Sequence, residues 1–376
     1  TGAVNFRSGA NGTRPNYTMT ATNFVPQSTF GAIDIQGFQD FNVNRNITSS
    51  GNITLVAFRD LTLNAANTIT TGAVGSLSLQ AANGNTGGTG NLNVNGNLSL
   101  GTGTVTMRSG ANGTRPNYTI TATNFVPQTT FGAIDIQGFQ DIFINRDITN
   151  SGSITIVSRR DLTLNALNTL TTGAAGALTL QAANNVIAGT GNLNLNGTIS
   201  VGTGALTLRS GVNGTRPNYT LTAANVIRQG ATFGAIDIRG FLDTFINRDM
   251  NSSGNVVITS FRDLTLNAAN TITSGAANGL NLQAANGNVA GTGNLNLNGT
   301  LSNGTGALTL LSGINGTRPT YTATATNLVR QGATFGVLNI QGFGNFIVDR
   351  VLNSSGTVDF ANNTQTTLRN NITSTG

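Results

Sequence analysis

The amino-acid sequence predicts an all-β protein, a parallel β-helix (solenoid) of about 15 coils, with four coils in each repeat of roughly 101 residues. Three observations predict this fold. A long repeat runs through the chain, a short apolar signal recurs four times within each long repeat, and strand-like alternation of apolar and polar residues fills the segments between the signals.

The long repeat is marked by the motif NGTRPNYT, which occurs three times and once more as NGTRPTYT, at residues 11–18, 112–119, 213–220 and 315–322. Successive copies are separated by 101, 101 and 102 residues, and the blocks FGAIDI and RDLTLNA recur with the same period. We therefore expect one continuous solenoid made of a partial first repeat (its last coil), three full repeats and a partial, divergent last repeat: 1–30, 31–131, 132–233, 234–335 and 336–376.

A shorter period lies within the long repeat. The pattern Gly-x-Φ-x-Φ, in which Φ is apolar, starts at five successive glycines: Gly31, Gly51, Gly75, Gly103 and Gly132. The intervals of 20, 24, 28 and 29 residues each leave room for about three short strands, which is what one turn of a β-helix needs. A β-sandwich would show consistent two-residue hairpin turns, and a propeller blade would take ~40–50 residues. Neither pattern fits this chain.

Alternation within the strands predicts which side chains point inward. The expected core comprises Ile33, Ile35, Ile53, Leu55, Leu61, Leu63, Leu77, Leu79, Val105 and Met107. Asp34, between two of these positions, is expected to point outward. A buried aliphatic side chain contributes ~1.5–3 kcal/mol to stability. The few such side chains in a single coil cannot offset the conformational entropy that is lost when about 25 residues become ordered. Stability must therefore come from stacking coil on coil.

Composition argues against enzymatic chemistry. All 19 basic residues are Arg, all 13 acidic residues are Asp, and Lys, Glu, His, Cys and Trp are absent. The usual general bases, thiolates and paired-carboxylate sets are therefore missing. Asp34, Asp135 and Asp237 recur with the long repeat and give way to Asn339, as architectural residues would. We predict no catalytic residue, no metal site and no cofactor.

Charge and hydropathy exclude two further classes of partner. The net charge of +6 is spread along the chain without a basic run, which argues against nucleic acid. No apolar segment approaches the ~18 residues needed to cross a membrane, so we expect no membrane insertion. The chain opens in mid-repeat without a signal peptide, which predicts that it is a segment of a longer polypeptide.

The segment GSLSLQAANGNTGGTGNLNVNGNLSLGTGTVTMRSGANG (75–113) resembles the repeat regions of filamentous-haemagglutinin-like proteins. These are large bacterial repeat exoproteins, many of them adhesins of the two-partner-secretion type. The resemblance covers nearly the whole chain through the patterns G-x-L-x-L-x-A and G-N-L-x-L-N-G, although the four-coil super-repeat departs from the family's usual pattern. It implies a right-handed parallel β-helix that projects from the cell surface as a fibre and acts in adhesion or biofilm structure.

Within NGTRPNYT, the Arg and Tyr side chains are candidate contact residues: Arg14, Tyr17, Arg115, Tyr118, Arg216, Tyr219, Arg318 and Tyr321. Two interpretations stand side by side. The motif is either a wide corner held by its Pro or a row of contacts ~19 Å apart for glycans or a neighbouring fibre. A second series, which includes Arg146 and Asp147, is expected to be structural, with these two residues paired to each other or to the segment 159–161.

These observations predict an extracellular or cell-surface rod, secreted and non-enzymatic, that mediates adhesion or the formation of a biofilm or matrix. The expected partners are other copies of the chain, through end-to-end or lateral contacts, and host or matrix glycans or proteins. One alternative is a self-assembling filament or sheath subunit that stacks end to end, and another is a carbohydrate-binding or carbohydrate-active β-helix. Frequent Thr-x-Thr also suggests ice binding, but coils of unequal length are expected to spoil the flat array that this needs.

Overall fold

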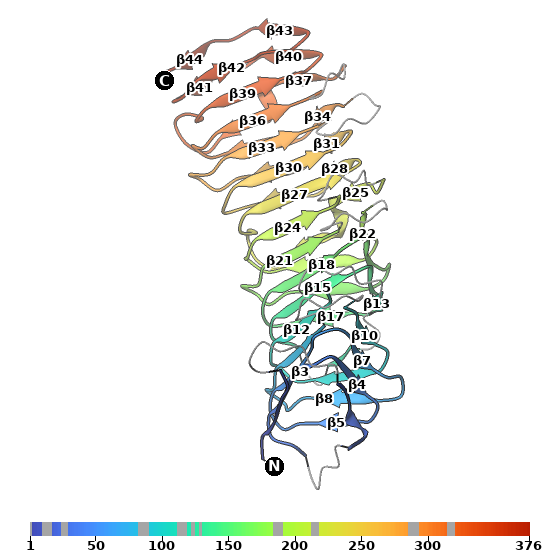
Figure 1. The fold of residues 1–376 in the computed structure, drawn as a ribbon. Helices are drawn as coiled ribbons and strands as arrows, with labels where there is room; N and C mark the ends of the chain where they lie inside the picture. The colour runs from blue at the N-terminus through green and yellow to red at the C-terminus, as the bar shows by residue number, and fades with distance from the viewer. Residues whose placement is uncertain are drawn as a thin grey trace.

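The computed structural model describes residues 2–9, 17–23, 29–81, 90–110, 119–121, 125–127, 130–182, 191–211, 218–284, 293–313 and 320–376. The described residues form a stack of coils that climbs from the amino-terminal to the carboxy-terminal end of the chain (Figure 1). They contain no α-helix, and their strands pair in parallel with the strands of the coils before and after them.

The first face of the stack is a 15-stranded sheet with one strand from each coil. Its strands are β1 (Val4–Arg7), β3 (Ile33–Phe38), β6 (Ile53–Ala57), β9 (Leu77–Gln80), β12 (Val105–Arg108), β15 (Ile134–Phe139), β18 (Ile154–Ser158), β21 (Leu178–Gln181), β24 (Leu206–Arg209), β27 (Ile236–Phe241), β30 (Val256–Ser260), β33 (Leu280–Gln283), β36 (Leu308–Leu311), β39 (Leu338–Gln341) and β42 (Val358–Asp359). The predicted parallel β-helix of about 15 coils is therefore confirmed.

The second strand of each coil contributes to a second face, divided into sheets of three or four strands. Its strands are β2 (Thr18–Thr20), β4 (Asp40–Val43), β7 (Leu61–Leu63), β10 (Leu92–Val94), β13 (Ile120–Thr121), β16 (Ile142–Ile144), β19 (Leu162–Leu164), β22 (Leu193–Leu195), β25 (Leu221–Thr222), β28 (Thr244–Ile246), β31 (Leu264–Leu266), β34 (Leu295–Leu297), β37 (Thr322–Thr324), β40 (Asn345–Val348) and β43 (Gln365–Leu368).

The third face is built in the same way from sheets of two to four strands. Its strands are β5 (Ile47–Thr48), β8 (Thr68–Thr70), β11 (Asn97–Leu100), β14 (Phe125–Pro127), β17 (Ile148–Thr149), β20 (Thr169–Thr171), β23 (Thr198–Val201), β26 (Val226–Arg228), β29 (Met250–Asn251), β32 (Thr271–Thr273), β35 (Thr300–Asn303), β38 (Leu328–Arg330), β41 (Leu352–Ser354) and β44 (Ile372–Ser374). Three described 3-10 helices turn the chain between the second and third faces: η1 (Ala21–Asn23), η3 (Ala223–Asn225) and η4 (Ala325–Asn327).

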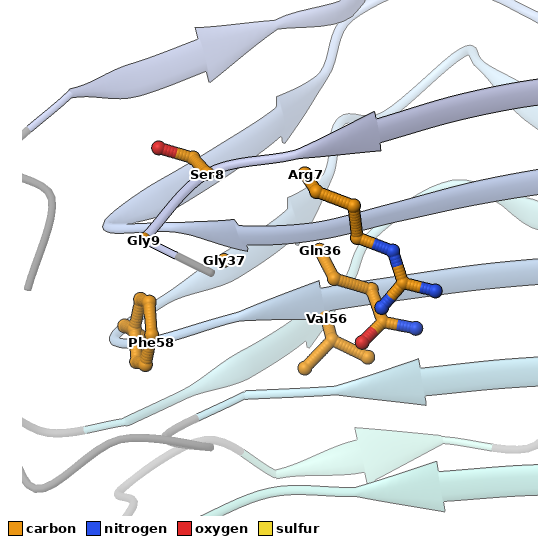
Figure 2. A pocket seen from close by; sticks show the side chains of 7 residues that line it. All are labelled: Arg7, Ser8, Gly9, Gln36, Gly37, Val56 and Phe58. Atoms are coloured by element: carbon orange, nitrogen blue, oxygen red, sulfur yellow. The ribbon is translucent and has the colours of Figure 1, made fainter. Parts of the chain in front are cut away.

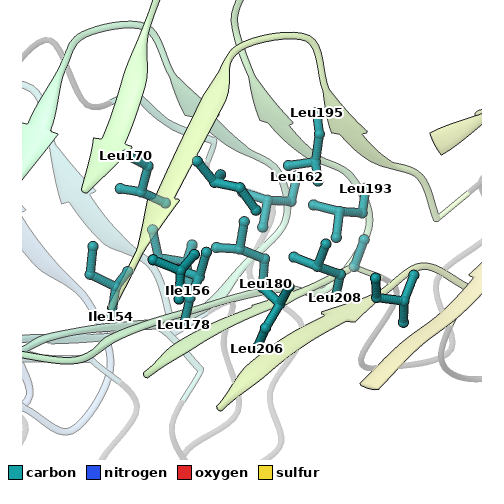
Figure 3. Close-up of a cluster of buried hydrophobic side chains, with 14 of the residues drawn as sticks. Ile154, Ile156, Leu162, Leu170, Leu178, Leu180, Leu193, Leu195, Leu206 and Leu208 are labelled. Carbon is teal, nitrogen blue, oxygen red and sulfur yellow. The ribbon is translucent and has the colours of Figure 1, made fainter. Parts of the chain in front are cut away.

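Register on the first face is regular despite the unequal coils. Ile33 pairs with Ile53, Ile53 with Leu77, and Leu77 with Val105, so equivalent apolar positions lie directly over one another. The corners absorb the difference between 20 and 29 residues, so the unequal coil lengths leave the strand register of this face intact. All ten predicted core residues are buried within one continuous cluster. Figure 3 shows the equivalent column of Ile and Leu side chains in the following repeat.

The glycines that open the coils lie where successive coils approach one another closely. A Cβ on Gly75 would lie 2.3 Å from the carbonyl oxygen of Gly51, and a Cβ on Gly103 would lie 2.4 Å from the carbonyl carbon of Gly75. Gly132 is confined in the same way, with 2.6 Å to the carbonyl oxygen of Thr102. Gly31 belongs to the same column, where its N–H donates to the carbonyl of Gly2. At Gly75, Gly103 and Gly132 the Gly of the signal is therefore required by backbone proximity, whereas at Gly51 the nearest atom to a Cβ would be 3.4 Å away.

Candidate functional site

The tyrosines of the NGTRPNYT motif lie at the corner that leads into the second face. Tyr219 and Tyr321 are half-buried and pack against the core, and burial raises the pKa of both hydroxyls. The Tyr219 ring is tilted against Phe241 with 6.4 Å between ring centroids, and the Tyr321 hydroxyl donates to Asn298 Oδ1 at 3.1 Å. Tyr17, by contrast, is 64% exposed. In the later repeats the Tyr is thus an anchor of the corner.

An Asn of the preceding coil holds the backbone at this corner. Asn192 Oδ1 accepts the N–H groups of Asn218 at 3.0 Å and Tyr219 at 3.3 Å, and Asn294 Oδ1 accepts the N–H of Thr320 at 3.1 Å. This role could not be predicted from the sequence, because an Asn in an Asn-rich chain has no distinctive neighbours. These bonds support the structural interpretation of the motif for its tyrosines.

The remaining candidates of the motif lie outside the described residues: Arg14, Arg115, Tyr118, Arg216 and Arg318. Their contact role stays a prediction. The four Arg nevertheless dominate the charge balance, because the described residues hold 15 of the 19 Arg and all 13 Asp. Four of the six net positive charges therefore belong to the motif, one for each copy.

The second series acts at another set of corners. Its guanidinium groups donate to carbonyl groups of the preceding coil: Arg45 to Thr22 (3.0 Å), Arg248 to Ala224 (2.9 Å) and Arg350 to Leu328 (2.9 Å). Asp147 Oδ1 accepts the N–H of Thr169 in the next coil at 2.7 Å. These bonds join neighbouring coils and fit the structural role expected for this series.

Three further ion pairs, which we call the Asp–Arg clasps, join successive coils at the entrance to the second face: Asp40–Arg59, Asp141–Arg160 and Asp243–Arg262. In each clasp Nε and Nη2 of the Arg donate to the two carboxylate oxygens, and the Nε–Oδ1 distances are 2.7–2.8 Å. The hydrogen bond to its Asp raises the pKa of each of these Arg side chains. Such bidentate pairs fix orientation as well as charge.

The clasp continues into the coil after it. The N–H of Asp161 donates to Asp141 Oδ1 at 3.1 Å, and Asp161 Oδ1 in turn accepts the N–H of Asn192 at 2.8 Å. A network of hydrogen bonds thus connects three consecutive coils. The sequence predicts the segment 159–161 as one alternative partner of Arg146 and Asp147, but Arg160 of this segment binds the carboxylate of Asp141.

The outer surface of the first face carries a separate set of ion pairs, each joining the last coil of one repeat to the first coil of the next: Arg7–Asp34, Arg108–Asp135 and Arg209–Asp237. Asp237 is also paired with Arg239 of its own strand. Asp34 points outward as predicted, and it also accepts a hydrogen bond from Gln36 Nε2 at 2.7 Å. These carboxylates are held by an Arg rather than by a second carboxylate. Each of these Asp residues is neutralised by an Arg, and the ion pairs do not bring two carboxyl groups together as an acid and a base.

A pocket of about 240 Å³ lies near the amino-terminal end of the first face. Its lining comprises Arg7, Ser8, Gly9, Gln36, Gly37, Val56 and Phe58 (Figure 2). In the next repeat the residue equivalent to Ser8 is Ser109, whose hydroxyl donates to the carbonyl of Gly90 at 3.3 Å. One repeat later, the chain at Gly90 therefore lies against the residues that correspond to this lining. Among the lining residues that the structure describes, one has an ionisable side chain, that of Arg7, and none has a carboxylate.

The described part of the chain contains no cluster of three or more Asp residues able to hold a metal ion. It also contains no helix of the length and hydropathy required to span a membrane. Comparisons with protein-family models, with curated proteins and with solved structures found no match.

Proposed function

We propose that this chain is a segment of an extracellular structural fibre, a stiff rod at a bacterial cell surface that serves adhesion or the formation of a biofilm or matrix. The observation that carries the proposal is the 15-stranded parallel sheet, which runs in register through every coil. At ~4.8 Å between strands, such a stack is about 70 Å long. A longer polypeptide of the same repeat extends this length in proportion.

Stiffness has a physical basis in the contacts between coils. Neighbouring coils share backbone hydrogen bonds on three faces, a continuous apolar column and the Asp–Arg clasps. Bending the rod would have to break several of these at once, because they are distributed around every side of each coil. Gln229 and Gln331 also reach across one coil, where Nε2 donates to the carbonyl groups of Thr172 and Ser274 at 2.7 Å. The resemblance to filamentous-haemagglutinin-like repeats supports a place at the cell surface.

The proposal includes the absence of catalysis. The carboxylates that recur with the repeat are paired with Arg, as at Asp135 and Asp141. A polysaccharide-cleaving site would need a carboxylic acid and a carboxylate facing one substrate. The ion-pair geometry supports a structural role for these residues instead.

Immunogold labelling tests the location of the chain. Antibodies raised against the purified chain should decorate intact cells of the organism that produces it, with label extending outward from the envelope. Label confined to permeabilised cells would overturn the proposal. Sedimentation of the purified chain provides a second measurement, because growth into long polymers without other components would favour a self-assembling filament over a fibre segment.

A further inference from the structure

Exposed phenylalanines recur on the second face of the rod in a column whose other members are Thr and Asn, apart from Ile347 at the equivalent position of the last repeat. The side chains of Phe143 in β16 and Phe245 in β28 point outward, and both are 38% exposed. They occupy equivalent positions in successive repeats, four coils apart, which corresponds to ~19 Å along the rod. A single exposed apolar side chain needs no special explanation. What distinguishes these two is that each ring lies in line with the same outward Thr and Asn side chains of the next two coils.

The neighbours of each Phe along the stacking direction are polar and uncharged. Phe143 pairs with Thr163 of the next coil, and Thr163 pairs with Asn194 of the coil after it. Asn194 Nδ2 donates to Thr163 Oγ1 at 3.1 Å. An amide carries two N–H donors and a carbonyl with two acceptor positions, so this one bond leaves most of its capacity for a partner. We call this set of three residues the Phe row.

The next repeat contains the same arrangement. Phe245 pairs with Thr265, Thr265 pairs with Asn296, and Asn296 Nδ2 donates to Thr265 Oγ1 at 3.0 Å. The first repeat has the same Thr–Asn pair but carries Asn42 in place of the Phe. The chain therefore provides two copies of the Phe row and one natural copy that lacks the aromatic ring.

We infer that the Phe row binds an extended, neutral polysaccharide that lies along the rod. A pyranose ring presents an apolar C–H face and hydroxyl edges, which match a Phe ring flanked by amide and hydroxyl groups. No charged residue belongs to the row itself, and the Arg side chains of the clasps beside it are already paired with Asp141 and Asp243, so we expect a neutral polymer rather than an anionic one. Because the row repeats in line, a partner that itself repeats can engage both copies at once.

A protein partner fits the row less well. A specific protein–protein interface buries ~800 Å² on each side with an apolar centre, whereas here single rings are separated by three coils of Thr and Asn. A second copy of the rod packed side by side would bury this polar surface in its interface. The isolated Phe rings offer too little apolar area for the centre of a protein interface, but each ring is large enough to stack against one sugar ring.

Affinity electrophoresis measures the predicted binding. The purified chain is run toward the cathode, because of its net charge of +6, in native gels that contain hydroxyethylcellulose or a soluble mixed-linkage β-glucan. Retardation by at least one of these neutral polymers is expected. The double variant Phe143→Asn/Phe245→Asn, which copies the first repeat, should bind about tenfold more weakly or worse.

Matched variants separate binding from folding. Phe143→Tyr/Phe245→Tyr keeps the aromatic rings and should retain retardation, and Leu167→Ala removes a fully exposed apolar side chain outside the row and should leave binding unchanged. Circular dichroism checks that each variant stays folded, as the natural Asn42 leads us to expect. A short oligosaccharide that cannot reach both rings should compete poorly with the polymer.

Several outcomes would overturn the inference. These are no retardation of the unmodified chain by either neutral polymer, equal retardation of the Phe→Asn double variant, or retardation by carboxymethylcellulose alone. Concentration-dependent association in sedimentation that the double variant abolishes would assign the row to contact between rods. The inference requires only the coil stack, so its failure would leave the proposed place of the fibre at the cell surface untouched.

Discussion

Arg160 binds Asp141 across the boundary between two coils, with its Nε 2.7 Å from Asp141 Oδ1 and its Nη2 bonded to Oδ2. The Asp141 side chain is only 7% exposed, whereas the equivalent figure for Asp135 in its pair with Arg108 is 29%. Both are Asp–Arg pairs, but Asp141 accepts two bonds from Arg160 and one from the N–H of Asp161. Asp135 accepts one bond from Arg108 and one from Gln137. Comparing them measures what burial and the additional hydrogen bonds contribute together.

Replacing Asp141 with Asn should lower the free energy of unfolding by about 1–3 kcal/mol, because a buried charge-assisted acceptor for Arg160 and for a backbone N–H is weakened. Asp135→Asn, on the exposed face, should cost no more than ~1 kcal/mol. Chemical denaturation of both variants measures the difference. Equal losses would show that burial and the additional hydrogen bonds of the clasp contribute nothing.

Asp40 predicts a dependence of stability on pH. Burial alone raises the pKa of Asp40, but the hydrogen bond from Arg59, the N–H of Asp60 and the Thr18 hydroxyl together bring it below its usual 3.8. A carboxyl whose pKa is lower in the folded state stabilises the fold above the unfolded pKa, and this contribution is lost as pH falls through the folded value. The clasp should therefore weaken below about pH 4.

Melting curves recorded at pH 6, 4 and 3 measure this effect. The unmodified chain should lose more stability between pH 4 and 3 than Asp40→Asn, which has no carboxyl to protonate at that position. Identical slopes for the two proteins would contradict a depressed pKa at Asp40.

The core and the first-face register could be predicted because they depend on local patterns. A period of two places Ile33 and Ile35 inward in one coil, and the recurring Gly marks where the next coil begins. The Asp–Arg clasp could not be predicted, although Asp141 and Arg160 recur together in three repeats. Pairing them requires knowing that both residues lie at the entrance to the second face, which depends on corner lengths.

The Phe row was missed for a related reason. The segment around Phe143 has the alternation of an ordinary strand and gives no sign of a surface role. The ring points outward because Ile142 and Ile144, on either side of it, are buried. Thr163 and Asn194 are separated from it by roughly one and two coils of chain. Only the stack brings these three residues into one column.

Gly103 predicts a strong response to a single methyl group. An Ala side chain there would lie 2.4 Å from backbone atoms of Gly75, so the two coils must separate, at a cost of about 1–3 kcal/mol or more. At Gly51 the nearest atom is 3.4 Å away, and Gly51→Ala should change stability by less than ~1 kcal/mol. Thermal denaturation of the two variants compares them directly. A larger loss for Gly51→Ala would contradict the close approach of Gly75 and Gly103.

Leu167 offers a stabilising substitution. Its φ of 65° is in the left-handed region, which costs a branched aliphatic residue about 1 kcal/mol, and its side chain is 99% exposed and so recovers none of this. Leu167→Asn should raise the free energy of unfolding by about 0.5–1 kcal/mol, because Asn adopts this conformation more readily. Val74→Asn is the control, an exposed apolar residue outside the positive-φ set, and should have little effect. A gain at Val74 equal to that at Leu167 would attribute the benefit to surface polarity alone.

Deleting residues 132–233 should remove four coils without disturbing those on either side. The deletion joins Phe131 to Gly234, which restores the Phe-Gly step that opens each repeat, and the ends of the remaining sheets present equivalent strands to one another. Because each coil depends mainly on its neighbours, the shortened chain should fold and melt cooperatively. Small-angle scattering should report a rod shorter by about 19 Å at unchanged cross-section. An unfolded or aggregated product would mean that the repeats are not interchangeable, and a rod of unchanged length would contradict stacking in register.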